Sequence, residues 1–145
     1  MNMFDAVTNV PVPVNEPPHS FAAGSAERSA LEARLKQLAS ERVQFTMTIG
    51  GEQRLGSGET IDVVQPHRKD AVLGALGNAT ADDVRDAVEA ARAAAPEWQR
   101  MSYDDRAAIF LKAAELLAGP WRHTLAAATM LGQSKTCYQA EIDTP

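Results

Sequence analysis

Residues 78–117 read NATADDVRDAVEAARAAAPEWQRMSYDDRAAIFLKAAELL, and this stretch decides the fold. Thr80 precedes a run with helical periodicity and has Asp83 three residues later, which is the pattern of a capping box. Pro96 interrupts the run, because proline lacks the backbone N–H that a helix interior needs. We therefore expect one helix over residues 81–95, a connector holding Trp98, and a second helix over residues 103–118. Apolar side chains recur on one face of the first helix at Val84, Ala87, Val88, Ala91 and Ala94.

The residues before this helical stretch indicate strands. Phe45, Met47 and Ile49 alternate with polar residues, and Gly50-Gly51 follows where a hairpin has to reverse. We expect the return strand over residues 59–64, where apolar and polar residues alternate again. Pro66 then ends that strand, and a third short strand is expected over residues 71–76.

The remaining segments are an arm and further helices. The first 24 residues are rich in proline and lack periodicity, so we expect an extended arm whose apolar side chains (Phe4, Val10, Val12 and Val14) need a surface to cover. Ser25 is placed to cap a helix over residues 26–39. Another helix is expected over residues 121–131, ended by Gly132 in the left-handed conformation. A last short helix is expected after Ser134. The sequence thus predicts an α/β chain with an arm and helix at 1–43 and the remainder at 44–145.

Composition limits the class of partner. The hydrophobic fraction is 45%, the charged fraction 23% and the formal net charge −5, which is typical of a folded domain and unlike the basic surface of a nucleic-acid-binding protein. No apolar run approaches the roughly 20 residues of a membrane span. The leader carries Asp5 and Glu16 and has no arginine before Arg28, unlike a transit peptide. A single cysteine, Cys137, fits a reducing compartment. We expect a cytoplasmic protein with neither nucleic-acid nor membrane partners.

The glycine-rich segments do not carry a nucleotide-binding signature. Residues 50–58 read GGEQRLGSG, but the third glycine of a dinucleotide fingerprint is missing and a strand follows instead of a helix. Residues 132–136 read GQSKT and lack the upstream glycine and the glycine-lysine pair of a P-loop. We interpret both segments as turns.

The candidate catalytic and metal-binding side chains also favour structural roles. Cys137 has no histidine or carboxylate placed nearby in sequence as a base, so we interpret it as an inert thiol. The three histidines show no paired ligand spacing, and one cysteine gives no C-x-x-C motif. Asp82, Asp83 and Asp86 lie in the first turns of a helix, where they complement its dipole. The sequence therefore predicts no catalytic, cofactor-binding or metal-binding residue. The histidines are His19, His67 and His123.

Several motifs in sequence order resemble the N-terminal part of the aldehyde dehydrogenase superfamily. They are Val64-Gln65-Pro66, Val72-Leu73-Gly74, Asn78-Ala79-Thr80, D-V-x-x-A-V-x-A-A-R (83–92), A-P-E-W (95–98) and R-A-A-I-F-L-K-A-A-E-L-L (106–117). Two further stretches resemble the 1-pyrroline-5-carboxylate dehydrogenase branch. These are V-P-x-N-E-P (12–17) and M-L-G-Q-S-K-T-x-x-Q-A-E-I-D (130–143).

The resemblance implies an incomplete part of the aldehyde dehydrogenase fold, with a β-hairpin and short strand followed by several helices. It also implies that residues 44–145 are the truncated N-terminal portion of the family's NAD-binding and oligomerisation region. It implies NAD-dependent oxidation of L-glutamate γ-semialdehyde to L-glutamate in proline breakdown. In the family a catalytic cysteine, a glutamate base and the nucleotide-binding strands lie further along a longer chain, so the NAD site is expected outside these 145 residues and the chain alone is expected to be inactive. The expected partners are the rest of the dehydrogenase chain and further copies in a homo-oligomer. Two alternatives stay open: a stand-alone protein-interaction module, and a part of another aldehyde dehydrogenase branch.

Overall fold

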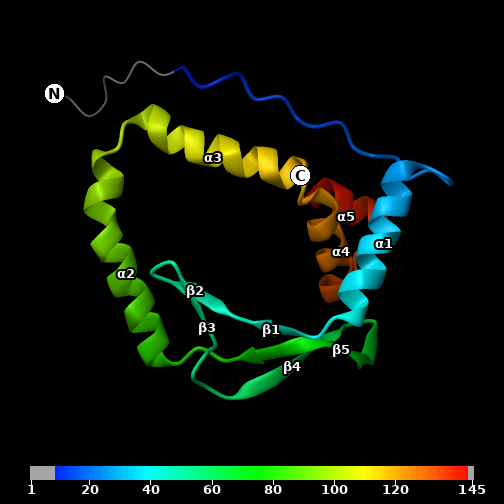
Figure 1. The fold of residues 1–145 in the computed structure, drawn as a ribbon, viewed down its shortest axis with the longest axis horizontal. Helices are drawn as coiled ribbons and strands as arrows, with labels where there is room; N and C mark the ends of the chain where they lie inside the picture. Colours follow the sequence, from blue (N-terminus) through cyan, green and yellow to red (C-terminus); the bar gives the residue numbers. More distant parts are fainter. Residues whose placement is uncertain (1–8, 144–145) are drawn as a thin grey trace.

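The computed structural model describes residues 9–143 as an open ring of helices closed on one side by strands (Figure 1). Helix α1 (Ala26–Ser40) is followed by strands β1 (Val43–Phe45), β2 (Met47–Ile49), β3 (Glu52–Arg54), β4 (Thr60–Gln65) and β5 (Arg68–Gly77). Helices α2 (Ala81–Arg100), α3 (Tyr103–Ala118), α4 (Arg122–Gln133) and α5 (Cys137–Asp143) complete the chain. This mixed architecture confirms the predicted α/β class.

The strands form two small sheets. In the first, β5 lies between β1, which is parallel to it, and β4, which is antiparallel. The second is the hairpin of β2 and β3. Gly50 and Gly51 form its two-residue turn with φ of 61° and 85°, which suits the tight turns of β-hairpins and is costly for other residues.

The predicted strand pairing was partly wrong. The return strand of the hairpin is β3, directly after the turn, and not residues 59–64. A two-residue turn leaves no room for a longer loop, and the polar β3 residues Glu52, Gln53 and Arg54 gave no alternating signal. Residues 60–65 instead pair with β5 through the turn at Pro66. Strand β5 is also longer than the predicted 71–76.

The helices follow their predicted caps. The Ser25 hydroxyl accepts a hydrogen bond from the Arg28 N–H, and Thr80 and Asp83 form the expected capping box. The Ser102 hydroxyl accepts from the Asp105 N–H at the start of α3. These short-range bonds explain why the helix starts are readable from the sequence.

Two predicted helix ends were wrong. Helix α2 continues through Pro96 to Arg100, because proline's fixed φ is helical and costs the interior one hydrogen bond, while Trp98 beyond it is held by contacts with α3. Helix α4 passes Gly132 and ends at Ser134, which adopts the left-handed conformation with φ 59°. Helix α5 consequently begins at Cys137, where the Thr136 hydroxyl accepts from the Gln139 N–H.

The hydrophobic core lies where α1, α4 and α5 meet. Leu31 packs there against Ala126, Ala127 and Ala140, and Leu35 and Leu38 extend the contact along α1. Small alanines let the helices approach closely. Arg34 of α1 also donates a hydrogen bond to Thr124 of α4 (3.0 Å).

The arm at residues 9–24 is extended and runs along α3 to α1 (Figure 1). Val10 lines a pocket with Trp98 and Phe110, whereas Val12 and Val14 are 85% and 84% exposed, so a surface that covers these two stays a prediction. Phe4, the other apolar residue expected in this role, lies outside the described residues. None of the helices between residues 9 and 143 has the length and apolarity needed to cross a bilayer.

Candidate functional site

A buried ion pair joins the arm to the last two helices. Arg122 lies at the start of α4 and Glu141 in α5, and their side chains are only 6% and 1% exposed. The Arg122 guanidinium donates to both carboxylate oxygens of Glu141. The same guanidinium donates to the carbonyl oxygen of Pro17 (3.0 Å), and the His19 N–H donates to Glu141 Oε1 (2.6 Å). Two charged side chains thus fix three segments at one point.

The electrostatics of Glu141 suit a structural ion pair and not a general base. Burial raises the pKa of the carboxyl group, but the hydrogen bonds from Arg122 and the His19 N–H outweigh it, so the net pKa is lowered. Glu141 is therefore charged at neutral pH, and donors of this chain occupy its oxygens. No local sequence pattern points to this pair, because the two residues are 19 positions apart on different helices.

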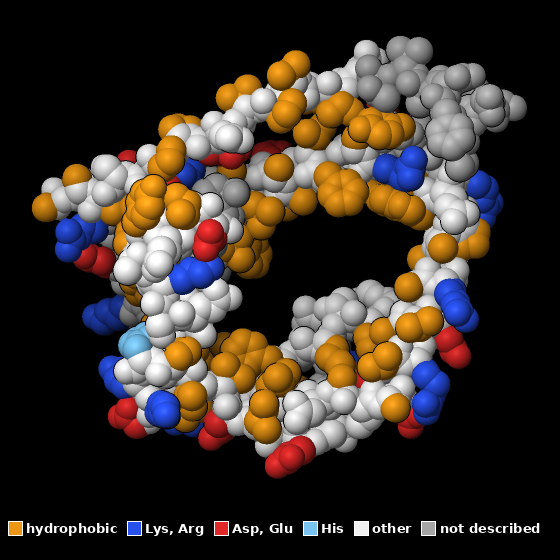
Figure 2. All heavy atoms as spheres, turned by 180° about the vertical axis from the view of Figure 1, so that it is seen from behind, with side chains coloured by type: hydrophobic (Ala, Val, Ile, Leu, Met, Phe, Trp, Pro, Cys, Tyr) orange, Lys and Arg blue, Asp and Glu red, His pale blue; other side chains and the backbone are white. Residues whose placement is uncertain are grey.

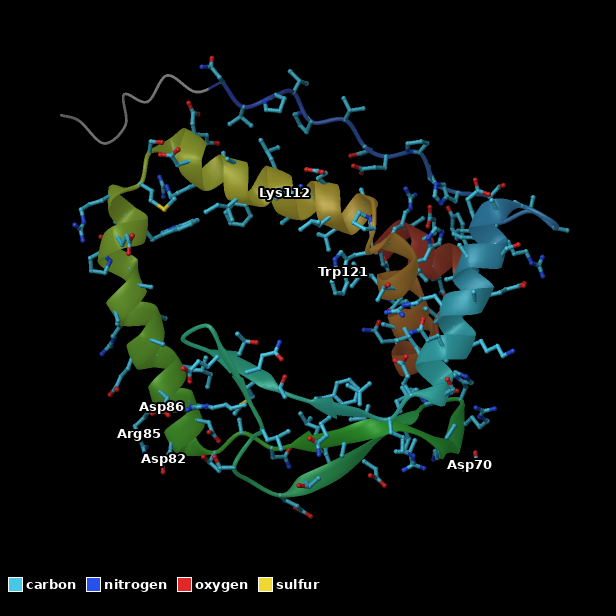
Figure 3. All side chains as sticks on the ribbon, viewed as in Figure 1. Asp70, Asp82, Arg85, Asp86, Lys112 and Trp121 are labelled. Atoms are coloured by element: carbon cyan, nitrogen blue, oxygen red, sulfur yellow. The ribbon has the colours of Figure 1, made fainter. Side chains whose placement is uncertain are left out.

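A second polar centre ties the loop before β4 to the start of α2. One Asp83 oxygen accepts from the Thr80 N–H (2.8 Å), and the Ser57 hydroxyl donates to the other (2.9 Å). Hydrogen bonds from Thr80 and then Ser57 hold the pKa of Asp83 well below its usual range. Arg54 of β3 pairs with Asp86 (2.8 Å), and Figure 3 shows Asp82, Arg85 and Asp86 on this end of α2. Asp83 and Asp86 thus make tertiary contacts with Ser57 and Arg54, in addition to the helix-dipole role that the sequence predicts for them.

Cys137 lies at the wall of a cavity of about 430 Å³ between the arm, α1 and α5. Burial raises the pKa of its thiol, the charge of Glu141 raises it further, and Arg28 opposes them. A raised pKa disfavours the thiolate that nucleophilic chemistry requires. The geometry agrees with an inert thiol, and its catalytic irrelevance stays a prediction. The cavity is lined by His19, Ser20, Phe21, Arg28, Leu31, Glu32, Leu35, Met130, Cys137 and Tyr138.

The histidines lie in two places. His19 and His123 stack with ring centroids 6.1 Å apart, and Phe21 lies edge-on to both. His67 contacts the Ser134 hydroxyl (2.8 Å). Within residues 9–143, no group of three His, Cys, Asp or Glu side chains converges as a metal cage would require.

A nucleotide's phosphates do not fit the described residues. The glycines at 56 and 58 pack tightly against the backbone of Gly77 and Asn78, so they allow a close chain approach and do not open a cradle. A helix N-terminus after a strand occurs at the join of β5 and α2. There the Asp83 carboxylate already occupies the Thr80 N–H, and Asp82 and Asp83 would repel an anion.

The ring encloses an opening with an apolar rim. Figure 2 shows that side chains leave this opening unfilled and that hydrophobic side chains gather along its edge. Trp121, which is 52% exposed, extends into the opening between α3 and α4 (Figure 3). Large apolar side chains are also exposed along α2 and α3, at Val84, Val88, Trp98, Ile109, Phe110, Leu111, Leu116 and Leu117. A surface of this kind indicates an interface.

The comparison with protein families decides the identity. The sequence profile of the aldehyde dehydrogenase family matches residues 54–145. The chain belongs to the aldehyde dehydrogenase family.

The curated relatives of this aldehyde dehydrogenase chain include two delta-1-pyrroline-5-carboxylate dehydrogenases. It is 40% identical over 129 residues to the human mitochondrial delta-1-pyrroline-5-carboxylate dehydrogenase, covering 89% of this chain and 23% of the relative. It is 34% identical over 139 residues to the mitochondrial enzyme of Dictyostelium discoideum, covering 95% of this chain and 25% of the relative. The chain thus spans about a quarter of the length of these relatives.

Solved structures give the same result. The delta-pyrroline-5-carboxylate dehydrogenase of Mycobacterium tuberculosis bound with NAD is 57% identical, with a TM-score of 0.92, over 97% of this chain and 26% of that one. The 1-pyrroline-5-carboxylate dehydrogenase R100A mutant of Thermus thermophilus is 27% identical with a TM-score of 0.83, over 94% and 26%. The predicted homology to this branch and the predicted partial match to its fold are confirmed.

Proposed function

We propose that this chain is the N-terminal scaffold of an NAD-dependent L-glutamate γ-semialdehyde dehydrogenase acting in proline catabolism. The observation that carries the proposal is the 57% identity, at a TM-score of 0.92, to the M. tuberculosis enzyme over nearly the whole chain. In the proposed reaction the semialdehyde, which is the open form of 1-pyrroline-5-carboxylate, reacts with NAD⁺ and water to give L-glutamate, NADH and two protons. The single cysteine fits the reducing cytoplasm that we propose as its compartment.

The chemistry itself is assigned to residues outside this chain. The described residues offer neither a phosphate cradle nor an activated nucleophile, since the start of α2 is occupied by Asp83 and the pKa of Cys137 is raised. NAD would supply the hydride acceptor when bound elsewhere in the enzyme. The partners proposed for this chain are therefore the rest of the dehydrogenase polypeptide and further copies in a homo-oligomer.

The ring gives this scaffold a physical role. Its exposed apolar rim along α2 and α3 is the face that the body of the enzyme would bury. The polar centre at Asp83 fixes the loop before β4 to one end of α2, where Arg54 of β3 also pairs with Asp86. The buried pair of Arg122 and Glu141 fixes α4 to α5. Both junctions hold the rim in one shape before the partner is present, which lowers the ordering cost of binding.

A chimaeric enzyme tests the proposal. The quarter of the M. tuberculosis dehydrogenase that matches this chain is replaced by residues 1–145, and NADH formation is measured with 1-pyrroline-5-carboxylate. We expect kcat/KM within about tenfold of the parent enzyme, because the replaced part touches no reacting atom. The isolated chain should form no NADH. A correctly folded, NAD-binding chimaera without turnover would contradict the proposal, as would activity that copurifies with the isolated chain.

The exposed rim also suits a second function. A stand-alone module that binds other proteins through α2 and α3 would present the same apolar surface. Such a module has to be stable without the dehydrogenase body, whereas a scaffold does not. Melting of the isolated chain separates the two functions.

A further inference from the structure

The arm at residues 9–24 is fastened at one end by a buried polar contact. The Glu141 carboxylate accepts from the His19 N–H, and Arg122 donates to the Pro17 carbonyl, so two backbone groups of the arm meet one buried ion pair. At the other end Asn9 makes a long, exposed hydrogen bond to Asp104 (3.4 Å). A hydrogen bond to a buried charge is worth more than an exposed one, so the fastening is uneven.

Apolar contacts of the arm lie at its two ends. Val10 lines a pocket with Trp98 and Phe110, whereas Val12 and Val14 are almost fully exposed, so the middle of the arm buries little apolar surface. Phe21 packs on the core of α1, α4 and α5, two residues after the fastened His19. The stretch from Pro17 to Phe21 thus combines the arm's buried polar contacts with its contact to the core.

The fastened stretch, residues 17–21, also covers a cavity. His19, Ser20 and Phe21 form one wall of the cavity of about 430 Å³ whose other walls include Leu31, Met130 and Cys137. If this stretch lifted, the cavity would lose that wall, and the thiol and the core leucine would face solvent.

We propose that the arm is a strap with a single latch, in which the Arg122–Glu141 pair holds residues 17–21 closed over the cavity beside Cys137. Release of the His19 N–H from Glu141 opens the cavity without breaking the ion pair between α4 and α5. The proposal is independent of the enzymatic function, because it concerns only contacts within this chain.

Cys137 makes the strap measurable, because it is the only cysteine of the sequence. The rate of its labelling by a bulky maleimide is compared in the chimaeric enzyme between native buffer and urea, and is followed by mass spectrometry on the peptide that contains Cys137. His19→Pro removes the backbone N–H that Glu141 accepts. His19→Ala is the matched control, because it loses the same ring and keeps the N–H. Cys137→Ser gives the background.

We expect wild type and His19→Ala to be protected from labelling relative to the urea-unfolded chain. His19→Pro should label about tenfold faster than His19→Ala, the factor that matches loss of one hydrogen bond to a charged acceptor. Far-UV circular dichroism should show equal helix content in both variants. Equal labelling rates in the two variants would refute the latch. Wild-type labelling as fast as in urea would refute the strap itself.

A second readout covers the case in which His19→Pro lowers the helix content. Limited proteolysis of the chimaeric enzyme with the wild-type sequence should then cut residues 9–16 before residues 17–21, because only the latter are latched. Simultaneous cleavage throughout the arm would overturn the proposal.

Discussion

At the scale of single residues, Glu141 and Asp83 perform the same task in two places. Each is a carboxylate with a lowered pKa that accepts hydrogen bonds from a backbone N–H and from a side chain of another segment. Each thereby joins parts of the chain that the sequence separates. Both carboxylates therefore hold separate segments of the chain in place.

These two carboxylates predict acid sensitivity. A group whose pKa is lower in the folded state contributes stability above its unfolded pKa, near 4, and loses it as the pH falls through the folded value. In the chimaeric enzyme we therefore expect the urea midpoint to decline as the pH is lowered from about 5 toward 3. The decline should be smaller in Asp83→Asn and Glu141→Gln. The exposed Glu115→Gln is the control and should show the wild-type decline. Parallel pH profiles in all four proteins would disprove the assignment.

We predict that the Cys137 thiol takes no part in catalysis. Cys137→Ser in the chimaera should leave kcat/KM with 1-pyrroline-5-carboxylate unchanged within about twofold, because the residue's raised pKa and its place beside the arm keep it out of the reaction. Steady-state NADH formation measures this. A loss of a hundredfold or more with normal folding would show that the thiol reacts.

At the scale of elements, Gly74 and Gly132 differ in the space around them, because Gly74 lies close to a neighbouring strand and Gly132 has no neighbour at that distance. A Cβ on Gly74 of β5 would overlap the Val43 carbonyl oxygen in β1, whereas one on Gly132 of α4 meets nothing within 4 Å. Gly74→Ala should lower the stability of the chimaera by about 1–3 kcal/mol by pushing β1 away. Gly132→Ala should raise it by about 0.5–1 kcal/mol, since alanine favours the helix. Urea unfolding measures both, and equal shifts would disprove the β1–β5 register.

The starts of α1, α2 and α3 could be read from the sequence, because the hydroxyls of Ser25, Thr80 and Ser102 each accept a hydrogen bond from the N–H three residues later. The start of α4 has no side-chain cap, and α5 begins after Thr136 and not after the predicted Ser134. Helix ends and strand partners could not be read from the sequence. Helix α2 continues past Pro96 because Trp98 contacts Phe110 and Arg106, which belong to the next helix. The parallel pairing of β1 with β5 joins residues about thirty positions apart, and no local pattern encodes it.

The same limit applies to the sites. The sequence predicted a dipole role for Asp83, because its cap is local, but not the bonds to Ser57, which arrive from a distant loop. The Arg122–Glu141 pair and the strap it holds were invisible for the same reason.

At the scale of the whole molecule, the ring of helices and strands encloses an unfilled opening in place of a packed centre (Figure 2). Its main packed cluster lies where α1, α4 and α5 meet, and Leu73 of β5 is buried separately, while α2 and α3 leave large side chains such as Phe110 (66% exposed) uncovered. Burying a few hundred Å² of such surface is worth on the order of 5–10 kcal/mol, comparable to the stability of a typical domain. The apolar rim therefore explains why a dehydrogenase body and this scaffold would depend on each other.

Thermal melting of the isolated 145-residue chain in the presence of a hydrophobic dye tests this dependence most directly. Because the rim lacks its partner, we expect strong dye binding at low temperature and a broad transition without cooperativity, or aggregation. A monodisperse monomer with little dye uptake and one sharp transition would contradict the scaffold and favour the self-sufficient binding module.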